Sequence, residues 1–162
     1  MAREIQLTRG QIAIVDDEDF EYLSQWKWCA VYFPSANVFY AERQSRKGEF
    51  DKPTKVKMHR QLMGFPEGLF VDHINHNTLD NRRENLRIAT RKENNRNSKK
   101  KAYNKSGYKG VSWNSNTGKW RAQINVDGKV IHLGLFLDPA EAHEAYKAAA
   151  ILYFGDFAYA DS

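Results

Sequence analysis

The sequence predicts an α+β protein with two small folded regions joined by a basic linker. Three observations lead to this prediction. The first third of the 162 residues mixes short apolar runs with turn residues, as strands and their connections do. The middle is polar and basic, and the last third has strand-like runs followed by an alanine-rich helical run. The expected domains are residues 1–97 and 106–162, with the linker over residues 98–105.

The composition is typical of a folded, soluble protein, with 41% hydrophobic residues and a net charge of +5. No apolar stretch approaches the roughly 18 residues of a membrane span, and the N-terminus does not look like a signal peptide. We therefore expect a cytoplasmic protein with no membrane partner. The single Cys29 cannot form an internal disulfide or a cysteine zinc cluster, so a small buried hydrophobe is the simpler interpretation.

The N-terminal region is expected to be mostly β-structure. Residues 16–26 are the exception, because an acidic start and the apolar residues Phe20, Leu23 and Trp26 on one side predict a short helix. The turn composition of residues 34–37 separates two of the expected strands. Strands are predicted over residues 11–15, 28–33, 38–43 and 55–59.

A strand, loop, strand, helix unit is predicted in the centre of the chain. Its strands are expected over residues 71–74 and 86–89. Thr90 with Glu93 three residues later forms a capping-box pattern that opens a basic helix. This segment has little apolar surface, so it must lean on the preceding strands or be organised by something polar, such as a metal ion.

The chemistry of this unit rests on Asp72, His73, Asn85 and Asn94. The oxygens of Asp72 and Asn94 are hard ligands suited to Mg²⁺ or Mn²⁺. A histidine has a reference pKa of about 6.5, so His73 can accept a proton from water near pH 7. Asn85 is expected to fix the orientation and tautomer of that histidine. Hydrolysis of a phosphodiester needs such an activated water beside a positive centre.

Simpler interpretations exist for the individual histidines. An Asp-His pair alone is commonly structural, and the ordered set of residues is what makes the hypothesis specific. His73 and His76 have a spacing that suggests zinc, but two histidines without a third ligand make a weak case. His76 is expected in a loop facing DNA or solvent. His59, followed by Arg60, has two open interpretations, which are phosphate contact and strand packing.

Positive charge is concentrated in the middle of the chain. Eleven basic and two acidic residues lie between Arg82 and Lys109, a local charge of +9 that leaves the remainder at −4. Such a segment is either a solvated face or a polyanion site, and its place beside the candidate catalytic residues favours the second. The residues expected to contact DNA here are Arg82, Arg83, Arg87, Arg91, Arg96, Lys99, Lys100, Lys101 and Lys109.

The segment from Val71 to Arg96 resembles the HNH nuclease motif with its ββα-metal fold. The resemblance implies a metal ligand at Asp72, a general base at His73, a loop-tying asparagine at Asn85 and a second metal ligand at Asn94. An asparagine at the last position is the variant associated with phage homing endonucleases, many of which nick one strand. The cysteine pairs that brace many HNH proteins are absent, so the N-terminal β region is expected to brace the motif.

The C-terminal region predicts a three-stranded antiparallel sheet and one helix. Asp127-Gly128 is a tight-hairpin pair. Asp138, Pro139 and Glu141 form a helix start, and Gly155 ends the helix. The strands are expected over residues 108–113, 119–126 and 129–136.

Period-2 alternation gives the second of these strands an apolar and a polar face. The side chains expected to pack under the helix are Trp120, Ala122, Ile124 and Val126. The polar face offers donors and acceptors for phosphates and base edges, and a solvated sheet surface is the simpler alternative. Its expected members are Lys119, Arg121, Gln123 and Asn125, joined by Lys109, Ser112 and His132.

Residues 106–160 resemble the AP2 DNA-binding domain, in which the sheet face opposite the helix enters the major groove. This face has fewer arginines than plant AP2 domains, so its sequence preference is not transferred. Both resemblances together imply a site-specific, homing-type DNA endonuclease that acts on double-stranded DNA, in the host cytoplasm if it is phage-encoded. The alternatives are a catalytically inactive DNA-binding regulator and an RNA-binding protein. No protein partner is implied, and monomer and homodimer are both open.

Overall fold

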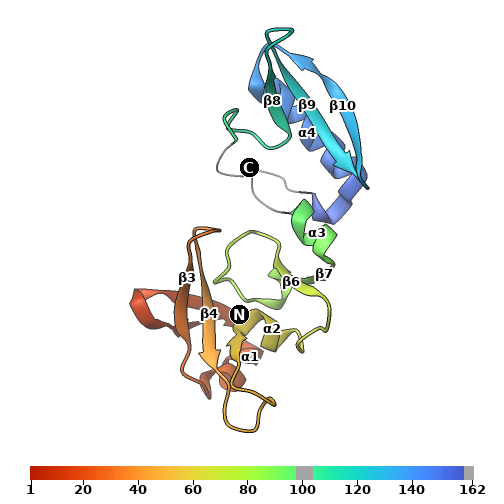
Figure 1. Cartoon of the computed structure of the whole chain (residues 1–162). Coiled ribbons are helices and arrows are strands. Elements are labelled where there is room, and N and C mark those ends of the chain that lie inside the picture. Colours follow the sequence, from red (N-terminus) through yellow and green to blue (C-terminus); the bar gives the residue numbers. More distant parts are fainter. Residues whose placement is uncertain (98–103, 159–162) are drawn as a thin grey trace. The chain divides into compact units, whose positions relative to one another are not determined.

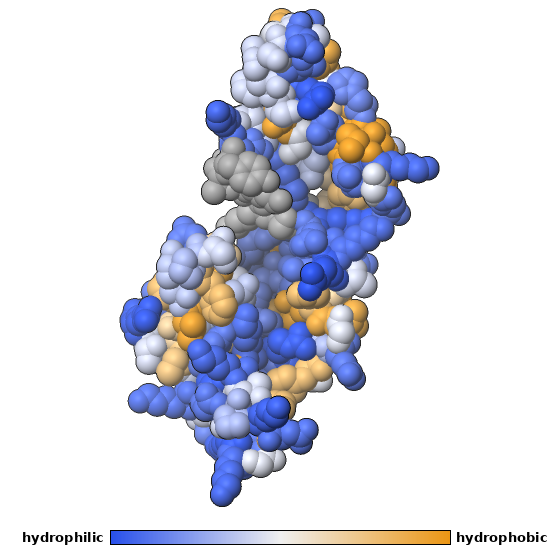
Figure 2. All heavy atoms as spheres, viewed as in Figure 1, coloured by the Kyte–Doolittle hydropathy of each residue, from blue (hydrophilic) through white to orange (hydrophobic). Residues whose placement is uncertain are grey.

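The computed structural model describes residues 1–97 and 104–158. The chain forms two compact units, Met1–Arg91 and Lys92–Ser162 (Figure 1). The division falls at the start of a helix that was expected to belong to the N-terminal domain, residues 1–97. Across the described ranges, no helix is both long and apolar enough to cross a membrane. Hydrophilic residues cover most of the visible face of each unit (Figure 2).

The first unit contains three small antiparallel sheets and two short α-helices. Strands β1 (Ala2–Gln6) and β2 (Ile12–Asp16) form one sheet, and β3 (Cys29–Phe33), β4 (Val38–Gln44) and β5 (Lys55–Lys57) form the second. Strands β6 (Phe70–His73) and β7 (Leu86–Ala89) form the third. The helices are α1 (Asp17–Ser24) and α2 (Met58–Leu62), with 3₁₀ turns at Thr8–Gly10 and Arg83–Asn85.

The core of the first unit is built from residues of all these elements. Leu23 of α1, Val15 of β2 and Met58 of α2 are fully buried, and Trp28 packs among them. The indole Nε1 of Trp28 donates to the Leu23 carbonyl at 2.9 Å, so its polar atom is satisfied inside the core. The predicted helix side with Leu23 is therefore confirmed as the buried side of α1.

The prediction of a strand over residues 55–59 is wrong at its end. Strand β5 stops at Lys57, and helix α2 begins at Met58. The alternating basic and apolar residues fit a strand, but Met58 and Leu62 are also spaced to share one face of a helix. Both are buried, and so is His59, because α2 packs this face into the core.

The N-terminal sheet braces the long loop between β6 and β7. The Ile14 amide donates to the Leu79 carbonyl at 2.8 Å, and the Asn81 amide donates to the Ile14 carbonyl at 2.7 Å. The loop is thereby fixed on the open edge of β2. The expected bracing of this segment by the N-terminal β region is confirmed, with backbone hydrogen bonds as its means.

The second unit contains a three-stranded sheet, the long helix α4 (Pro139–Phe154) and most of the short helix α3 (Arg91–Arg96). Only the first residue of α3, Arg91, belongs to the first unit. The strands β8 (Val111–Asn114), β9 (Lys119–Val126) and β10 (Lys129–Phe136) are antiparallel, with β9 in the centre. A 3₁₀ turn at Gly155–Phe157 follows α4. The predicted three strands and helix are present, although β8 begins three residues later than expected, at Val111.

Local signals explain this unit well. Asp127 and Gly128 both have positive φ, at 55° and 84°, as the tight β9–β10 turn requires. The Asp138 carboxylate accepts from the Ala140 amide at 2.9 Å and caps α4 at its N-terminus. Ala122 of β9 and Ala142 of α4 are completely buried, so these small residues let the helix lie close on the sheet.

Candidate active site

Asp72 and His73 end strand β6 and are both buried, at 8% and 5% exposed. Antiparallel pairing with β7 places Asp72 opposite Arg87 and His73 opposite Leu86. Successive residues of a strand point to opposite faces, so the carboxylate and the imidazole leave β6 in different directions. The two side chains therefore have different surroundings.

Asp72 lies in a charge-assisted pair with Arg87. The Arg87 Nε and Nη2 atoms donate to Asp72 Oδ2 at 2.9 and 2.8 Å, and both side chains are nearly buried. Arg87, predicted to contact DNA, thus has a carboxylate partner within its own hairpin. The carboxylate is a hard oxygen donor held in a defined position.

His73 is positioned by Asn81. Its Nε2 atom lies 3.4 Å from Asn81 Oδ1, and Asn81 is 1% exposed. The Asn81 Nδ2 atom donates to the Leu79 carbonyl at 3.1 Å. This hydrogen bond fixes the orientation of the Asn81 amide, so that its oxygen faces His73. An oxygen that faces the ring favours the tautomer with hydrogen on Nε2, which leaves Nδ1 as the basic nitrogen.

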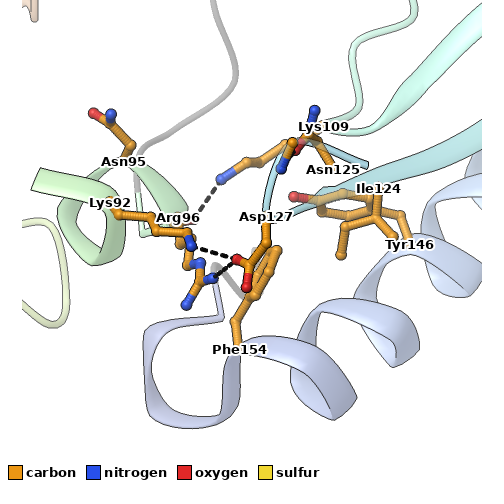
Figure 3. Close-up of a pocket in the computed structure, with 10 residues that line it drawn as sticks. Lys92, Asn95, Arg96, Lys109, Ile124, Asn125, Asp127, Tyr146 and Phe154 are labelled. Atoms are coloured by element: carbon orange, nitrogen blue, oxygen red, sulfur yellow. Dashed lines mark hydrogen bonds and ion pairs between the residues drawn. The ribbon is translucent and has the colours of Figure 1, made fainter. Parts of the chain in front are cut away.

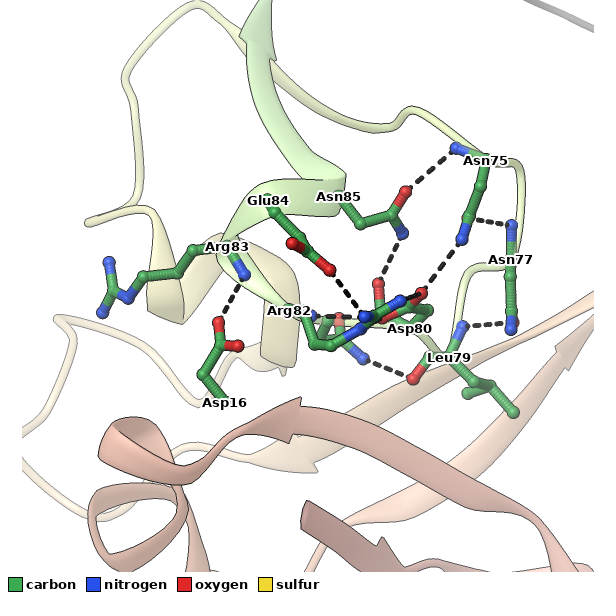
Figure 4. Close-up of polar contacts among 10 residues, drawn as sticks. Asp16, Asn75, Asn77, Leu79, Asp80, Arg82, Arg83, Glu84 and Asn85 are labelled. Atoms are coloured by element: carbon green, nitrogen blue, oxygen red, sulfur yellow. Dashed lines mark hydrogen bonds and ion pairs between the residues drawn. The ribbon is translucent and has the colours of Figure 1, made fainter. Parts of the chain in front are cut away.

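Asn81 was missed in the sequence because asparagines are frequent throughout this loop. Its role depends on its burial between His73 and β2, which no local pattern reveals. Asn85, the residue predicted to orient the histidine, has a different position. Its side chain accepts from the Asn75 amide at 2.9 Å and donates to the Asp80 carbonyl at 2.8 Å (Figure 4). Asn85 thus ties the loop to the end of β6, as the resemblance implies, and acts on backbone rather than on the imidazole.

A second histidine lies against the candidate base. The ring centroid of His59 is 4.9 Å from that of His73 at an interplanar angle of 76°, and His59 is buried. The Tyr40 ring lies 5.4 Å from His59 and 6.2 Å from His73. Of the two interpretations open for His59, packing inside the unit is the one that the structure supports.

Burial determines the protonation of both histidines. It lowers the pKa of His59 well below 6.5, with His73, Lys57 and Arg60 adding to the effect. Burial also lowers the pKa of His73, and this outweighs the opposing effects of Asn81 and Asp72. Both imidazoles are therefore neutral at neutral pH, which is the state that a general base needs.

Two arginines of the loop are paired with carboxylates. Arg82 Nε and Nη2 donate to the two oxygens of Asp80 at 2.8 and 2.7 Å, and this pairing lowers the pKa of Asp80 (Figure 4). Arg83 donates to both oxygens of Asp19 in α1 at 2.8 and 2.7 Å. Their predicted DNA contacts stay predictions, and a phosphate would have to compete with these carboxylates.

The other basic residues of the central segment lie in the first unit, in the second unit or outside the described residues. Arg91 lies over the Phe70 ring at 5.7 Å. In the second unit, Lys92 and Arg96 pair with Asp127 at 2.5 and 3.0 Å, and Lys109 donates to the Arg96 carbonyl at 2.7 Å (Figure 3). These contacts line a cavity of about 380 Å³. Lys99, Lys100 and Lys101 lie outside the described residues.

Asn94 lies on α3 and belongs to the second unit, whereas Asp72 belongs to the first. Its part in a metal site therefore stays a prediction from sequence. Within residues 1–97 and 104–158, no three His, Cys, Asp or Glu residues converge on a point. One carboxylate and one amide would leave most of the coordination to water, which Mg²⁺ tolerates well. The donor chemistry of Asp72 thus fits a hard divalent cation.

The predicted polar face of the second sheet is present on its strands, whereas Lys109, which was expected on it, precedes β8 and donates to the Arg96 carbonyl. The cross-strand pairs Ser112 with Arg121 and Gln123 with His132 place these side chains on one face. Arg121 Nη2 lies 3.4 Å from Ser112 Oγ, and its buried Nε has no hydrogen-bond partner in the described chain. Lys119 and Asn125 are exposed on the same strand, and the Asn125 side chain accepts from the Gly128 amide at 3.0 Å.

Comparison with known proteins connects this site to nucleases. Residues 58–96 match the model of the HNH endonuclease family, and the match begins at α2, upstream of the motif seen in the sequence. Protein 3.8 of Escherichia phage T7 is 42% identical over 64 residues, which make up 40% of this chain and 53% of that protein. The aligned part thus spans about half the length of that relative.

A second relative is an uncharacterized HNH endonuclease of Acanthamoeba polyphaga mimivirus. It is 27% identical over 156 residues, covering 93% of this chain and 74% of that protein. The family match covers β6, β7 and the candidate base His73, together with the histidine packed against it. Residues 58–96 of the chain are therefore similar to an HNH endonuclease domain, and the longer alignment with the mimivirus protein agrees with this similarity.

Proposed function

We propose that this protein is a site-specific, homing-type endonuclease that hydrolyses phosphodiester bonds of double-stranded DNA. The observation that carries the proposal is the buried, neutral His73, held by Asn81 and preceded in β6 by the ion-paired Asp72, inside the segment that matches the HNH family. A fixed neutral imidazole and a hard oxygen donor are the two kinds of group that metal-assisted hydrolysis requires.

Each residue has a defined task in this proposal. His73 accepts the proton of the attacking water, and Asn81 holds its ring and tautomer. Asp72 and Asn94 would hold one divalent ion, Mg²⁺ or Mn²⁺, and Arg87 would keep the Asp72 carboxylate in place. The bound ion would supply a positive centre for the phosphoryl and leaving oxygens.

Target recognition is assigned to the second unit. Arg121, Gln123 and His132 share one sheet face and offer donors to base edges and phosphates. The unsatisfied buried Nε of Arg121 supports this assignment, because an incoming acceptor would satisfy it. The likeness of this unit to the AP2 domain is part of the proposal, and a phage-encoded protein of this kind would act in the host cytoplasm.

The test is cleavage of a randomised duplex DNA library by the full chain with Mg²⁺, followed by sequencing of the ends. We expect discrete cleavage sites, and their pattern on the two strands distinguishes nicks from double-strand breaks. His73→Ala is expected to lower the rate by about 10²- to 10⁴-fold while DNA binding is retained. His76→Ala, in the adjacent loop, is the matched control and is expected to cut normally. Chelation of divalent ions should abolish cleavage, and equal inactivity of wild type and His73→Ala would refute the proposal.

A catalytically inactive DNA-binding regulator is the second candidate. The observation that favours it is the Asp72–Arg87 pair, because the guanidinium occupies a carboxylate oxygen that a metal ion would use. Under this alternative, the wild-type chain binds its DNA site with or without Mg²⁺ and Mn²⁺ but leaves both strands intact. The same library experiment, with bound DNA recovered and sequenced, distinguishes the two.

A further inference from the structure

Lys57 is held among aromatic rings, one of which also contacts the candidate base. Its Nζ atom is 4.3 Å from the Tyr40 ring centroid and 4.5 Å from that of Phe33. Tyr40 is the same ring that lies 6.2 Å from His73. Strand pairing explains this position, since Lys57 of β5 lies opposite Glu42 of β4, two residues after Tyr40 on the same face.

The ammonium group of Lys57 has unused hydrogen-bond donors. Among the described residues its ion-pair partner is Glu42, whose Oε1 lies 3.9 Å away, beyond hydrogen-bonding distance. In the described parts of the chain, Nζ donates no hydrogen bond to any residue. Arg60, its neighbour on α2, differs because it donates to the carbonyls of Leu69 and Pro66 at 2.9 and 2.8 Å. The Lys57 side chain is 31% exposed, so a ligand can reach it.

A partly buried cation without an acceptor is energetically unfavourable, which makes this position informative. Burial lowers the pKa of Lys57, with Glu42 opposing the effect. Cation–π contacts with two rings compensate for part of the lost hydration. An anionic oxygen within reach would satisfy the remaining donors, and a lysine ammonium suits a phosphate as a compact point charge.

The competing explanation is that Lys57 only balances the charge of Glu42. Glu42 is 4% exposed, and its described ion-pair partner is Lys57. A buried carboxylate needs a counterion, so a role in stability is expected in any case. The pair with Glu42, at 3.9 Å, leaves the hydrogen-bond donors of the ammonium unused, and the group lies on the ring that also contacts His59 and His73.

We propose that Lys57 is a substrate-binding residue whose ammonium group contacts a non-bridging oxygen of the phosphodiester cleaved at His73. This inference rests on the proposed endonuclease function. It assigns to Lys57 the recognition of the reacting phosphate, in a part of the chain that lies outside the basic segment. Because charge builds up on that phosphate as the bond is cleaved, the contact strengthens in the transition state.

The test compares four variants of the full chain: Lys57→Gln, Lys57→Arg, Glu42→Gln/Lys57→Gln and the control Lys27→Gln, which removes an exposed charge between α1 and β3. The substrate is the duplex that wild type cleaves best in the library. At saturating DNA, Lys57→Gln is expected to lower the single-turnover rate about 10²-fold. Lys57→Arg should stay within a few-fold of wild type, as should Lys27→Gln.

The double variant separates the two explanations, because it removes the buried carboxylate together with its counterion. Phosphate binding predicts that Glu42→Gln/Lys57→Gln stays as slow as Lys57→Gln although it is folded. Recovery of the wild-type rate in the double variant would overturn the proposal, and so would an unchanged rate in Lys57→Gln.

The salt dependence of DNA binding gives a readout that does not need cleavage. Loss of one phosphate contact lowers the slope of log K against log salt by about one, so both Lys57 variants that lack the charge should show this change. If wild type cuts no DNA, the proposed function fails, and the slope measured on the duplex that wild type binds best still decides whether Lys57 contacts a phosphate. An unchanged slope in that case would overturn the inference.

Discussion

In the first unit, polar side chains from distant parts of the chain meet in buried positions, whereas the second unit is held by neighbouring strands and one capped helix. Arg83 of the β6–β7 loop pairs with Asp19 of α1, and Asn81 lies buried between His73 and the Leu79 carbonyl. In the second unit, the close contact of Ala122 with Ala142 joins sheet and helix. The candidate catalytic base therefore lies in the unit where burial of polar groups is most demanding.

The two units therefore place different requirements on their side chains. A buried polar group must keep its hydrogen bonds, so the first unit tolerates few alternatives around His73. A helix lying on a sheet through small residues requires space rather than specific partners. Variants that remove space should damage the second unit, and variants that remove partners should damage the first.

Gly110→Ala is expected to have the largest effect, and it should act on the second unit. Gly110 has φ of 76°, and a Cβ atom there would lie 2.0 Å from Cδ2 of Tyr146. Left-handed strain and overpacking against a buried ring together predict a loss of about 3 kcal/mol. Amide hydrogen exchange of the full chain should show lost protection in β8 and α4 while the first unit keeps its protection.

Gly118→Ala is the matched control for that variant. Gly118 also has positive φ, at 63°, but no atom lies within 4 Å of the added Cβ. Backbone strain alone predicts a loss of about 1 kcal/mol. Equal losses for the two glycines would show that the contact with Tyr146 does not matter.

Asn81→Ala tests the polar side of the comparison. The variant removes the group beside His73 and leaves the Leu79 carbonyl without its donor. We expect a loss of about 2 kcal/mol in the first unit, as for other buried polar groups left without a partner. Urea unfolding followed by amide NMR signals of each unit measures this. Asn77→Ala, which removes an exposed cap from the Leu79 amide, should cost clearly less, and a reversed order would contradict the comparison.

Acid should weaken the first unit selectively. Burial lowers the pKa of His59 and His73 in the folded state, so the native unit binds fewer protons than the unfolded chain at pH values just below 6.5. The stability that these neutral histidines contribute is fully present above pH 6.5 and is lost as pH falls through the lowered pKa values. Urea midpoints of the first unit should therefore decrease from pH 7.5 to pH 5.

The variant His59→Gln removes one of the two titrating groups. The slope of the urea midpoint against pH should flatten in this variant, even if its stability at pH 7.5 is lower. The same lowered pKa of His73 predicts that cleavage continues below pH 6.5, because the base stays unprotonated there. A cleavage rate that already decreases when the pH is lowered to 7 would contradict this assignment.

The smallest expected effect is that of Asp138→Ala. The carboxylate of Asp138 accepts from the Ala140 amide at the start of α4. Loss of this cap should destabilise the second unit by about 1 kcal/mol, and Asp138→Asn should restore most of it. Thermal unfolding followed by the same NMR signals measures both variants. A loss in the first unit instead would break the division between the units.

The second unit could be predicted almost completely because its signals are local. The Asp127-Gly128 turn, the Asp138 cap and the Gly155 stop each lie within a few residues of the structure that they determine. Strands β9 and β10 have the predicted bounds, and the apolar alternation of β9 correctly gives its buried face, with Ala122 and Ile124.

The candidate site could be predicted only in part. Asp72 and His73 could be found because they are adjacent and belong to an ordered set of residues. Asn81, His59 and Lys57 could not, because their contacts depend on how β2, α2 and β5 fold back onto β6 and its loop. Helix α2 itself was hidden by a pattern that fits a strand equally well. The grouping of α3 with the second unit also depends on tertiary contacts, such as that of Arg96 with Asp127.

The bracing of the β6–β7 loop by β2 has a consequence for synthesis on the ribosome. The Arg83 amide donates to Asp16 across 67 residues of chain, and the open edge of β2 receives its partner from the same loop. An emerging N-terminal sheet therefore keeps an unpaired edge until the loop has left the exit tunnel. Such edges are prone to pairing with other chains. We expect chaperones to protect the nascent N-terminal segment from association with other chains during this interval. The C-terminal hairpins, in contrast, close as soon as they emerge.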